Sequence, residues 1–196
     1  ATSRKFLVNF MSMVFAGFVV ADESTFVTAS DLADDEAYIL VGLAVKGDQR
    51  NRVEGISLHD ALSDMKIVIP NNSGTQLLKV KAGNYKPDRV LLSGDDNNRS
   101  KSLMRVYRDV QGVVIPPQTV TYIGDWVVSY GERILVGARR INVDRLSYGV
   151  YYNADSLARI PSEYPSLLSY TPSISAANGR LLEAKWGESV MDRTIA

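Results

Sequence analysis

The chain has 196 residues, of which 45% are hydrophobic and 22% are charged, so it is long enough to bury a core and falls in the globular range. Its 22 basic and 22 acidic residues leave no net charge, and no basic run exceeds two residues. Nucleic acid is therefore not an expected partner, because its binding ordinarily requires concentrated basic residues. The absence of cysteine excludes disulfides, thiolate metal sites and a cysteine nucleophile.

Residues 1–21 have the features of a secretory signal. Arg4 and Lys5 precede an apolar run at 6–20, and Ala21 follows just before an acidic pair. As a helix, this 15-residue run would reach roughly 22 Å, short of the roughly 30 Å core of a bilayer. The expectation is a cleaved signal peptide and a secreted or periplasmic protein of the cell envelope. Retention of 6–20 as a hydrophobic membrane anchor is the alternative.

The chain beyond residue 21 shows a β pattern. Short runs rich in Val, Ile and Tyr alternate with turn residues, which is typical of an all-β sandwich or barrel. We expect strands at 24–28, 37–45, 65–69, 76–81, 88–92, 103–110, 118–129, 132–143 and 146–152. We expect a polar link at 46–55, loops at 71–74 and 93–98, and a tight hairpin turn at 129–132. Residues 22–152 are therefore predicted to form one sandwich domain.

The last segment, 153–196, shows weak helical signals. Asn153 or Asp155 would cap a short helix that Pro161 stops, and another turn or two would follow around Pro165. Three apolar residues farther on share one helical face, namely Leu182, Trp186 and Val190. The sequence predicts a short helical or irregular tail that packs on the sandwich.

The sequence contains no recognisable catalytic motif. The only histidine, His59, precedes Asp60, but neighbours in a strand point to opposite faces and therefore cannot form a relay. The chain has no Gly-x-Ser-x-Gly turn and no glycine-rich phosphate loop. We therefore expect no enzymatic activity and no nucleotide cofactor.

Metal sites are equally unsupported. One histidine and no cysteine exclude the common zinc motifs. Asp95 and Asp96 supply oxygen atoms, but their spacing lacks the alternating acids and distal glutamate of a calcium loop. The acidic run 34–36 is most simply a solvated turn. No metal or other cofactor is expected.

Aromatic residues offer a weak alternative function. Tyr148, Tyr151 and Tyr152 lie close together in sequence, and with Trp126 they are candidates for a ring platform that binds sugar faces. Alternate strand positions share a face, so Tyr148 and Tyr152 would lie on one side and Tyr151 on the other. The alternative is a structural role, with these rings in the core or at its rim, where tyrosine is common.

Two segments carry a family resemblance. VKAGNYKPDRVLL (80–92) contains Gly83 and Tyr85, and IPPQTVTYIGDW (115–126) contains Tyr122, Gly124 and Asp125. Together they resemble bacterial envelope proteins of unknown function that have prealbumin-like β-sandwich domains and a Tyr-Ile-Gly-Asp motif. The later ADSLARIPSEYPSLL (154–168) is similar to the short helical tail of those proteins. Many of them are lipoproteins, whereas this chain lacks the lipid-bearing cysteine.

The resemblance implies a prealbumin-like or immunoglobulin-like sandwich and supplies no catalytic residues. Physically, a bulge or a close backbone approach is expected at Gly124, and Asp125 is expected to cap the turn that this glycine allows. A glycine turn is expected at Gly83, and Tyr85 and Tyr122 are expected to cover the sandwich edge.

The expected function is that of a non-enzymatic envelope accessory or assembly subunit that acts through protein partners or self-association. Carbohydrate or peptidoglycan binding, with or without hydrolysis, is the alternative.

Overall fold

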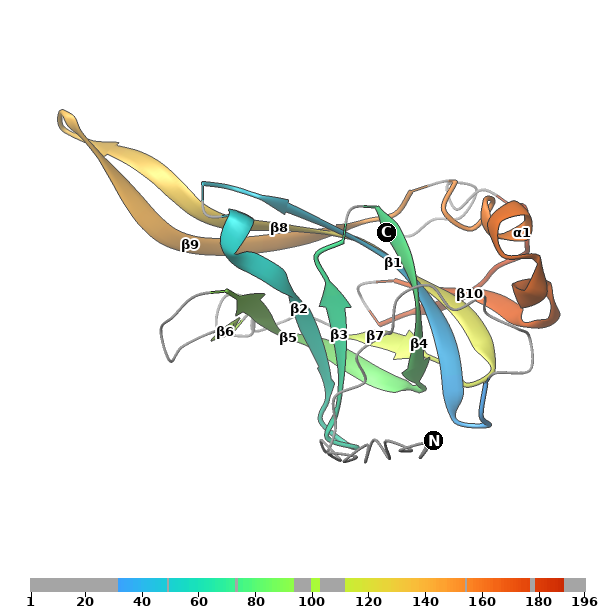
Figure 1. The fold of residues 1–196 in the computed structure, drawn as a ribbon. Coiled ribbons are helices and arrows are strands. Elements are labelled where there is room, and N and C mark those ends of the chain that lie inside the picture. Colours follow the sequence, from blue (N-terminus) through green and yellow to red (C-terminus); the bar gives the residue numbers. More distant parts are fainter. Residues whose placement is uncertain are drawn as a thin grey trace, which may run out of the picture.

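Two β-sheets face each other, and short helical segments lie against the outer side of one of them (Figure 1). This computed structural model describes residues 32–48, 50–72, 74–93, 100–102, 112–153, 155–176 and 179–188, with backbone alone at 100–102, 132–135 and 140–145. The predicted all-β sandwich with short C-terminal helical segments is confirmed. The expected signal (1–21), the strands at 24–28 and 103–110, and loop residues 94–98 lie outside the described residues.

The larger sheet, sheet A, has the order β11-β10-β8-β1-β4, and β9 also pairs with β8. Its strands are β1 (Glu36–Lys46), β4 (Thr75–Lys81), β8 (Thr119–Val136), β9 (Arg139–Tyr151), β10 (Thr171–Ser175) and β11 (Leu181–Glu183). Strands β1 and β10 both run parallel to β8, while the other pairs in sheet A are antiparallel.

The second sheet, sheet B, has the order β3-β2-β5-β6, and β7 also pairs with β5. Its strands are β2 (Val53–Asp60), β3 (Met65–Pro70), β5 (Gly83–Leu92), β6 (Ser100–Ser102) and β7 (Val113–Ile115). Three short helical segments complete the described fold, namely η1 (Arg50–Arg52), α1 (Ile160–Glu163) and η2 (Pro165–Ser169).

Sheet A is covered on both faces where β1 and β8 lie side by side. Its inner face and the facing side of sheet B enclose the inner core, which includes Ile39 and Trp126. Its outer face carries the outer core, where Tyr38 and Tyr122 pack against five residues of the C-terminal segment: Leu157, Ile160, Leu167, Tyr170 and Ile174. Residues 37–43 are almost continuously apolar because both faces of β1 are buried.

Strand β8 moves its apolar residues from one face of sheet A to the other at Gly124. Val120 and Tyr122 belong to the outer core, whereas Trp126 and Val128 belong to the inner core. Residues separated by an even number share a face in a regular strand, so this change requires one inserted residue. It lies at Gly124, where the register against β1 shifts and φ is +87°. Of the two features expected at this glycine, a bulge or a close backbone approach, the structure has the bulge.

The β8–β9 hairpin is longer than the sequence suggested. The tight turn predicted at 129–132 is wrong, because β8 continues to Val136 and the chain turns at Gly137 and Ala138. Gly131 has φ of +76° and lies where the pairing of β8 with β9 changes register. β9 advances three residues there while β8 advances two, so the extra residue belongs to β9 and Gly131 lies opposite it. The glycine therefore lies within a continuous strand and does not end it.

Other boundaries also differ from the sequence prediction. Strand β2 begins at Val53, so it occupies the end of the polar link expected at 46–55. Pro161 lies in the first turn of α1 and does not stop a helix, a position that proline tolerates because the first amides have no helical acceptor. Leu182 lies in β11 and Trp186 in a turn, so the predicted helical face is wrong, although both residues pack against the outer core.

Replacing Gly124 tests the bulge. A Cβ at this position would lie 2.5 Å from Cγ1 of Val150 and 3.1 Å from the carbonyl oxygen of Tyr151. Gly124→Val should lower the free energy of unfolding by about 1–3 kcal/mol from backbone strain, with a further loss from the contact. Gly74→Val is the matched control, since Gly74 has φ of +93° and no atom within 4 Å of its Cβ position. Urea unfolding should show the larger loss for Gly124→Val, and equal losses would contradict a packed bulge.

Candidate functional site

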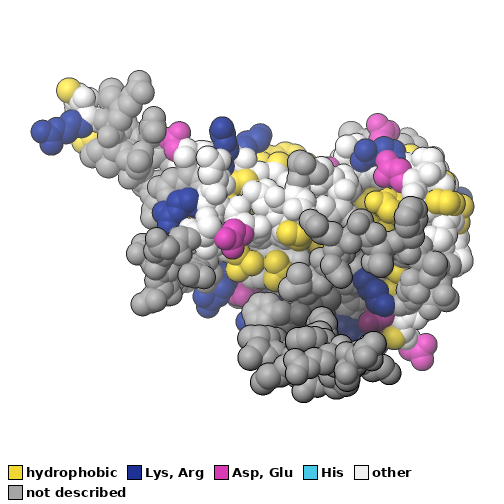
Figure 2. Space-filling view, in the orientation of Figure 1, with side chains coloured by type: hydrophobic (Ala, Val, Ile, Leu, Met, Phe, Trp, Pro, Cys, Tyr) yellow, Lys and Arg dark blue, Asp and Glu magenta, His cyan; other side chains and the backbone are white. Residues whose placement is uncertain are grey.

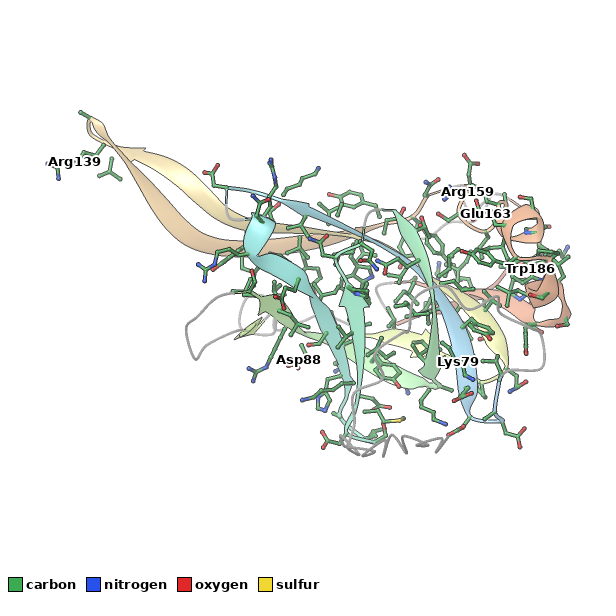
Figure 3. All side chains as sticks on the ribbon, in the orientation of Figure 1. Lys79, Asp88, Arg139, Arg159, Glu163 and Trp186 are labelled. Carbon is green, nitrogen blue, oxygen red and sulfur yellow. The ribbon has the colours of Figure 1, made fainter. Side chains whose placement is uncertain are left out.

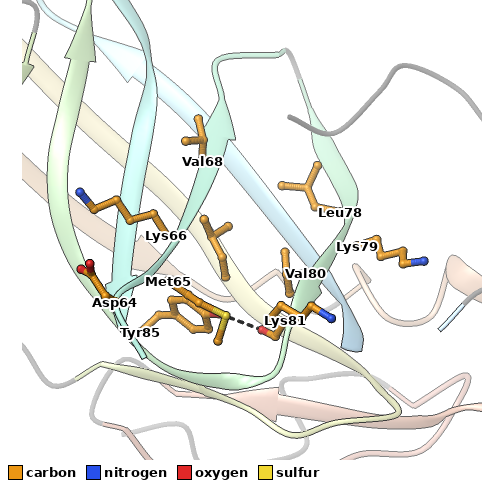
Figure 4. Close-up of a pocket in the computed structure, with 10 residues that line it drawn as sticks. Asp64, Met65, Lys66, Val68, Leu78, Lys79, Val80, Lys81 and Tyr85 are labelled. Carbon is orange, nitrogen blue, oxygen red and sulfur yellow. Dashed lines mark hydrogen bonds between the residues drawn. The ribbon is translucent and has the colours of Figure 1, made fainter. Parts of the chain in front are cut away.

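An apolar groove opens between β3 and β4, the edge strands of the two sheets (Figure 4). The two strands are consecutive in sequence, yet β3 pairs only with β2 and β4 only with β1 among the described strands. Their facing edges leave a cavity of about 270 Å³. At the ~30 Å³ that a water molecule occupies in the liquid, this is room for roughly nine non-hydrogen atoms. One or two apolar side chains would fill it.

The floor of the groove belongs to the inner core. Three buried side chains line the cavity, namely Ile67 of β3 and Leu78 and Val80 of β4. Half-buried Met65 lies at one end. Tyr85 of β5 closes the bottom and is fully buried. Its hydroxyl donates a hydrogen bond of 2.9 Å to the carbonyl oxygen of Lys81, and burial raises the pKa of Tyr85 to about 12. The ring is therefore a neutral, fixed surface.

The charges around the groove are mostly neutralised. Lys81 Nζ lies 2.8 Å from Oδ1 of Asp35, and Lys79 Nζ lies 3.1 Å from Oε2 of Glu36. The hydrogen bond to Lys81 lowers the pKa of Asp35, and the backbone N–H of Ala33 does the same for Glu36. Lys66 borders the cavity from β3 and is exposed. The entrance is thus polar and nearly neutral above an apolar floor.

The Tyr-Ile-Gly-Asp segment lies on the other side of sheet A. Tyr122 is fully buried in the outer core, so the expectation that it covers the sandwich edge is wrong. Tyr85 lies beneath the open β3–β4 edge as part of the inner core and does not cover that edge from outside. The Tyr122 hydroxyl accepts a hydrogen bond from the backbone N–H of Asn153, and burial raises its pKa to about 12. The motif therefore connects sheet A to the C-terminal segment.

Asp125 is packed tightly against β1, and its carboxylate lacks part of its hydrogen bonding. A Cβ on Gly42 would come within 2.4 Å of Oδ1 of Asp125, so the bare glycine makes room for the carboxylate. That Oδ1 atom is buried and has no hydrogen-bond partner, so it does not cap the bulge as expected. Burial raises the pKa of Asp125, although the Tyr122 hydroxyl and the Arg159 guanidinium both favour the charged form.

Gly83 is the first residue of β5 rather than part of a left-handed turn, since its φ is not positive. A Cβ there would lie 2.7 Å from Oδ2 of Asp60 and 3.1 Å from Cε2 of Tyr85. The glycine therefore lets a strand pass closely beside a buried carboxylate and the groove floor, a role that spacing alone did not suggest.

The four candidate sugar-binding rings do not form one platform. Trp126 is 2% exposed and stacks on Tyr148 within the sandwich, with ring centroids 5.6 Å apart. Tyr152 donates to the carbonyl oxygen of Ser175 and meets Tyr122 edge to face in the outer core. Tyr151 is 63% exposed and is the one ring of the four on the surface. The rings are thus dispersed over two cores and the surface.

His59 and Asp60, the candidates for a catalytic relay, point to different surroundings, as the alternation of a strand predicted. His59 Nε2 lies 2.9 Å from Oδ1 of exposed Asp64, while the neighbouring Asp60 is buried and accepts the backbone N–H of Leu62. Within the described ranges, no group of three or more His, Asp or Glu residues could hold a metal ion. Asp95 and Asp96 lie outside those ranges.

Comparison with protein-family models, with curated proteins and with solved structures finds no match to this chain. The resemblance to bacterial envelope proteins therefore stays a prediction. The described part of the chain contains no helix that is long and apolar enough to cross a membrane.

Sequence reasoning identified strands at both walls of the groove but not the groove itself. Residues 65–69 and 76–81 read as two strands joined by a loop, which ordinarily form a hairpin. The structure instead assigns them to different sheets. Four residues, 71–74, make this connection, and the amide groups of Asn71 and Gln76 hold it by donating to Val53 and Pro70 carbonyl oxygens.

Neutralising Asp125 should stabilise the fold at neutral pH. Because its folded pKa is raised, its stabilising contribution is present below the unfolded pKa and is lost as pH rises through the folded pKa. Asp125→Asn should therefore melt at a higher temperature than the parent at pH 7, and the difference should vanish at acidic pH.

Asp35→Asn is the opposite control, because the pKa of Asp35 is lowered and its contribution is lost as pH falls. This variant should melt at or slightly below the parent temperature at pH 7. Thermal melts across the pH range measure both effects. A lower melting temperature for Asp125→Asn at pH 7 would show that the carboxylate is stabilising.

Proposed function

We propose that this chain is a non-enzymatic protein-binding module that accepts an extended polypeptide segment between β3 and β4. The observation that carries the proposal is the apolar groove flanked by two strands with no further partner strand in the described part of the fold. A segment laid there would pair its backbone with one edge and place alternate side chains in the groove. Such a strand would close this side of the inner core.

The strand edges beside the groove favour a polypeptide over other ligand classes, because only an extended backbone can pair with them. The cavity of about 270 Å³ lies at the lower end of the range of about 300–1,000 Å³ that is common for small-molecule sites. An anionic amphiphile would need a cluster of cations at the entrance, but Lys79 and Lys81 already pair with carboxylates, which leaves Lys66 alone to meet an anionic headgroup. One or two apolar side chains of a strand need neither a larger cavity nor a charged entrance.

We place this activity in the bacterial cell envelope, secreted or periplasmic, where the chain would serve as an accessory or assembly subunit. The basic residues, the apolar run and the small residue in 1–21 support this placement. Strand addition suits an assembly role because main-chain pairing supplies affinity while the groove selects the side chains.

A library of displayed short peptides tests the proposal on the full chain. Selected peptides should carry apolar residues at alternate positions, and their binding should slow hydrogen exchange at amides of β3 and β4. Met65→Arg places a charge at one end of the groove and should weaken binding about tenfold or more, equivalent to ~1.4 kcal/mol. Leu62→Arg adds the same charge at a neighbouring side chain that is 91% exposed and should bind normally.

Three results would contradict strand acceptance. In the first, peptides bind without protecting amides of β3 or β4. In the second, Met65→Arg and Leu62→Arg weaken binding equally. In the third, no peptide binds, while soluble peptidoglycan fragments bind and shift the resonances of exposed Tyr151, which would favour the carbohydrate alternative.

A further inference from the structure

Strands β8 and β9 extend beyond both sheets as a two-stranded arm, residues 130–146 (Figure 1). The last pair between β1 and β8 joins Lys46 to Ser129, whereas β8 and β9 remain paired as far as Val136 and Arg139. At about 3.3 Å per residue, the seven residues from Tyr130 to Val136 span roughly 23 Å. Figure 3 shows Arg139 at the tip, far from the body of the sandwich.

Within the described part of the chain, no third strand and no second layer packs against the arm beyond its base. Two strands without a third strand or a packed layer are marginally stable in water. Tyr130 and Leu146 at its base are buried in the inner core, but Val136 at its tip is 53% exposed. Gly137, Ala138 and Arg139 are also exposed. An arm of this length is better explained by a contact that it makes outside the described fold.

The register places apolar residues on both faces of the arm. Ile134 pairs with Ile141 and Val136 with Arg139, so these four positions share one face. Leu135 pairs with Arg140 on the opposite face. A protein partner docked on one face would leave the apolar position on the other face uncovered. An apolar medium that surrounds the tip covers both.

The distal part of the arm carries only positive charges. Residues 133–140 include Arg133, Arg139 and Arg140 and no acidic residue, although the whole chain has no net charge. Figure 2 shows basic and hydrophobic side chains together at the arm's tip. Arginines that flank apolar residues suit the headgroup region of a bilayer, because their long stems lie along apolar surface while the guanidinium groups meet phosphates.

We propose that the tip of the arm binds an anionic lipid bilayer, with residues 134–138 in the interfacial region and the arginines at lipid phosphates. This contact is separate from the β3–β4 groove, which belongs to the body of the sandwich. It is also separate from any anchoring by residues 6–20. The sandwich would then sit at the membrane surface with the groove available to a partner.

Vesicle sedimentation of the full chain tests the arm. The protein should bind vesicles that contain phosphatidylglycerol and bind pure phosphatidylcholine vesicles weakly, and added salt should reduce binding. Arg139→Glu/Arg140→Glu should lower the partition coefficient by roughly 25-fold or more, about fivefold per arginine removed from an anionic surface. Lys86→Glu/Lys185→Glu makes the same change in net charge on exposed residues of the body and should have a much smaller effect.

A fluorescent label then locates the contact. Because the chain has no cysteine, Val136→Cys and Leu62→Cys each provide one labelling site. An environment-sensitive dye at position 136 should shift to the blue with anionic vesicles, while the same dye at exposed position 62 should not.

Several results would overturn the proposal. Equal losses from the two double substitutions would show that net charge alone matters. Equal binding to neutral and anionic vesicles, or binding without a dye shift at position 136, would assign the contact to another segment. A dimer in light scattering that Arg139→Glu/Arg140→Glu dissociates, without any vesicle binding, would show that the arm joins two copies of this chain.

Discussion

The bulge at Gly124 is the constraint on which the rest of the structure depends. It lets a single strand, β8, contribute Tyr122 to the outer core and Trp126 to the inner core. Without an inserted residue, both side chains would share one face, and one of the two cores would lose its central ring. Sheet A can therefore carry sheet B on one side and the C-terminal segment on the other.

Because sheet A is buried on both sides, the Tyr-Ile-Gly-Asp segment makes its contacts inside the fold. The Tyr122 hydroxyl receives the Asn153 N–H, which fixes the start of the C-terminal segment. Gly42 on the neighbouring strand leaves space for Asp125. The buried carboxylate is an energetic cost within this arrangement, since one of its oxygens has no hydrogen-bond partner.

The two proposed contacts arise where the two-layer arrangement is incomplete. Between β3 and β4 the inner core reaches the surface, because these consecutive strands enter different sheets and no strand of the described fold pairs with their facing edges. Beyond Ser129, β8 and β9 continue after β1 has ended, so the arm has neither a third strand nor a facing sheet among the described residues. Both places expose strand edges or apolar positions that the rest of the fold covers.

Local patterns in the sequence predicted much of the fold. The alternation and turn residues located β1, β3, β4 and most of β8 because these strands bury one or both faces in regular order. Gly124 was identified as a bulge because it interrupts that order. His59 and Asp60 were separated because neighbours on a strand face opposite ways. These inferences need only the two-residue period of a strand.

The sequence by itself therefore determined the fold class, the positions of β1, β3, β4 and most of β8, and the irregularity at Gly124, since each depends on residues near one another in the chain. Tertiary structure alone decided that β3 and β4 lie in different sheets, that Tyr85 forms the floor of a groove and that β8 continues through Gly131. It also decided that 171–175 joins sheet A as β10. These features depend on pairing between distant segments, and a local pattern of apolar residues is the same whichever strand becomes its neighbour.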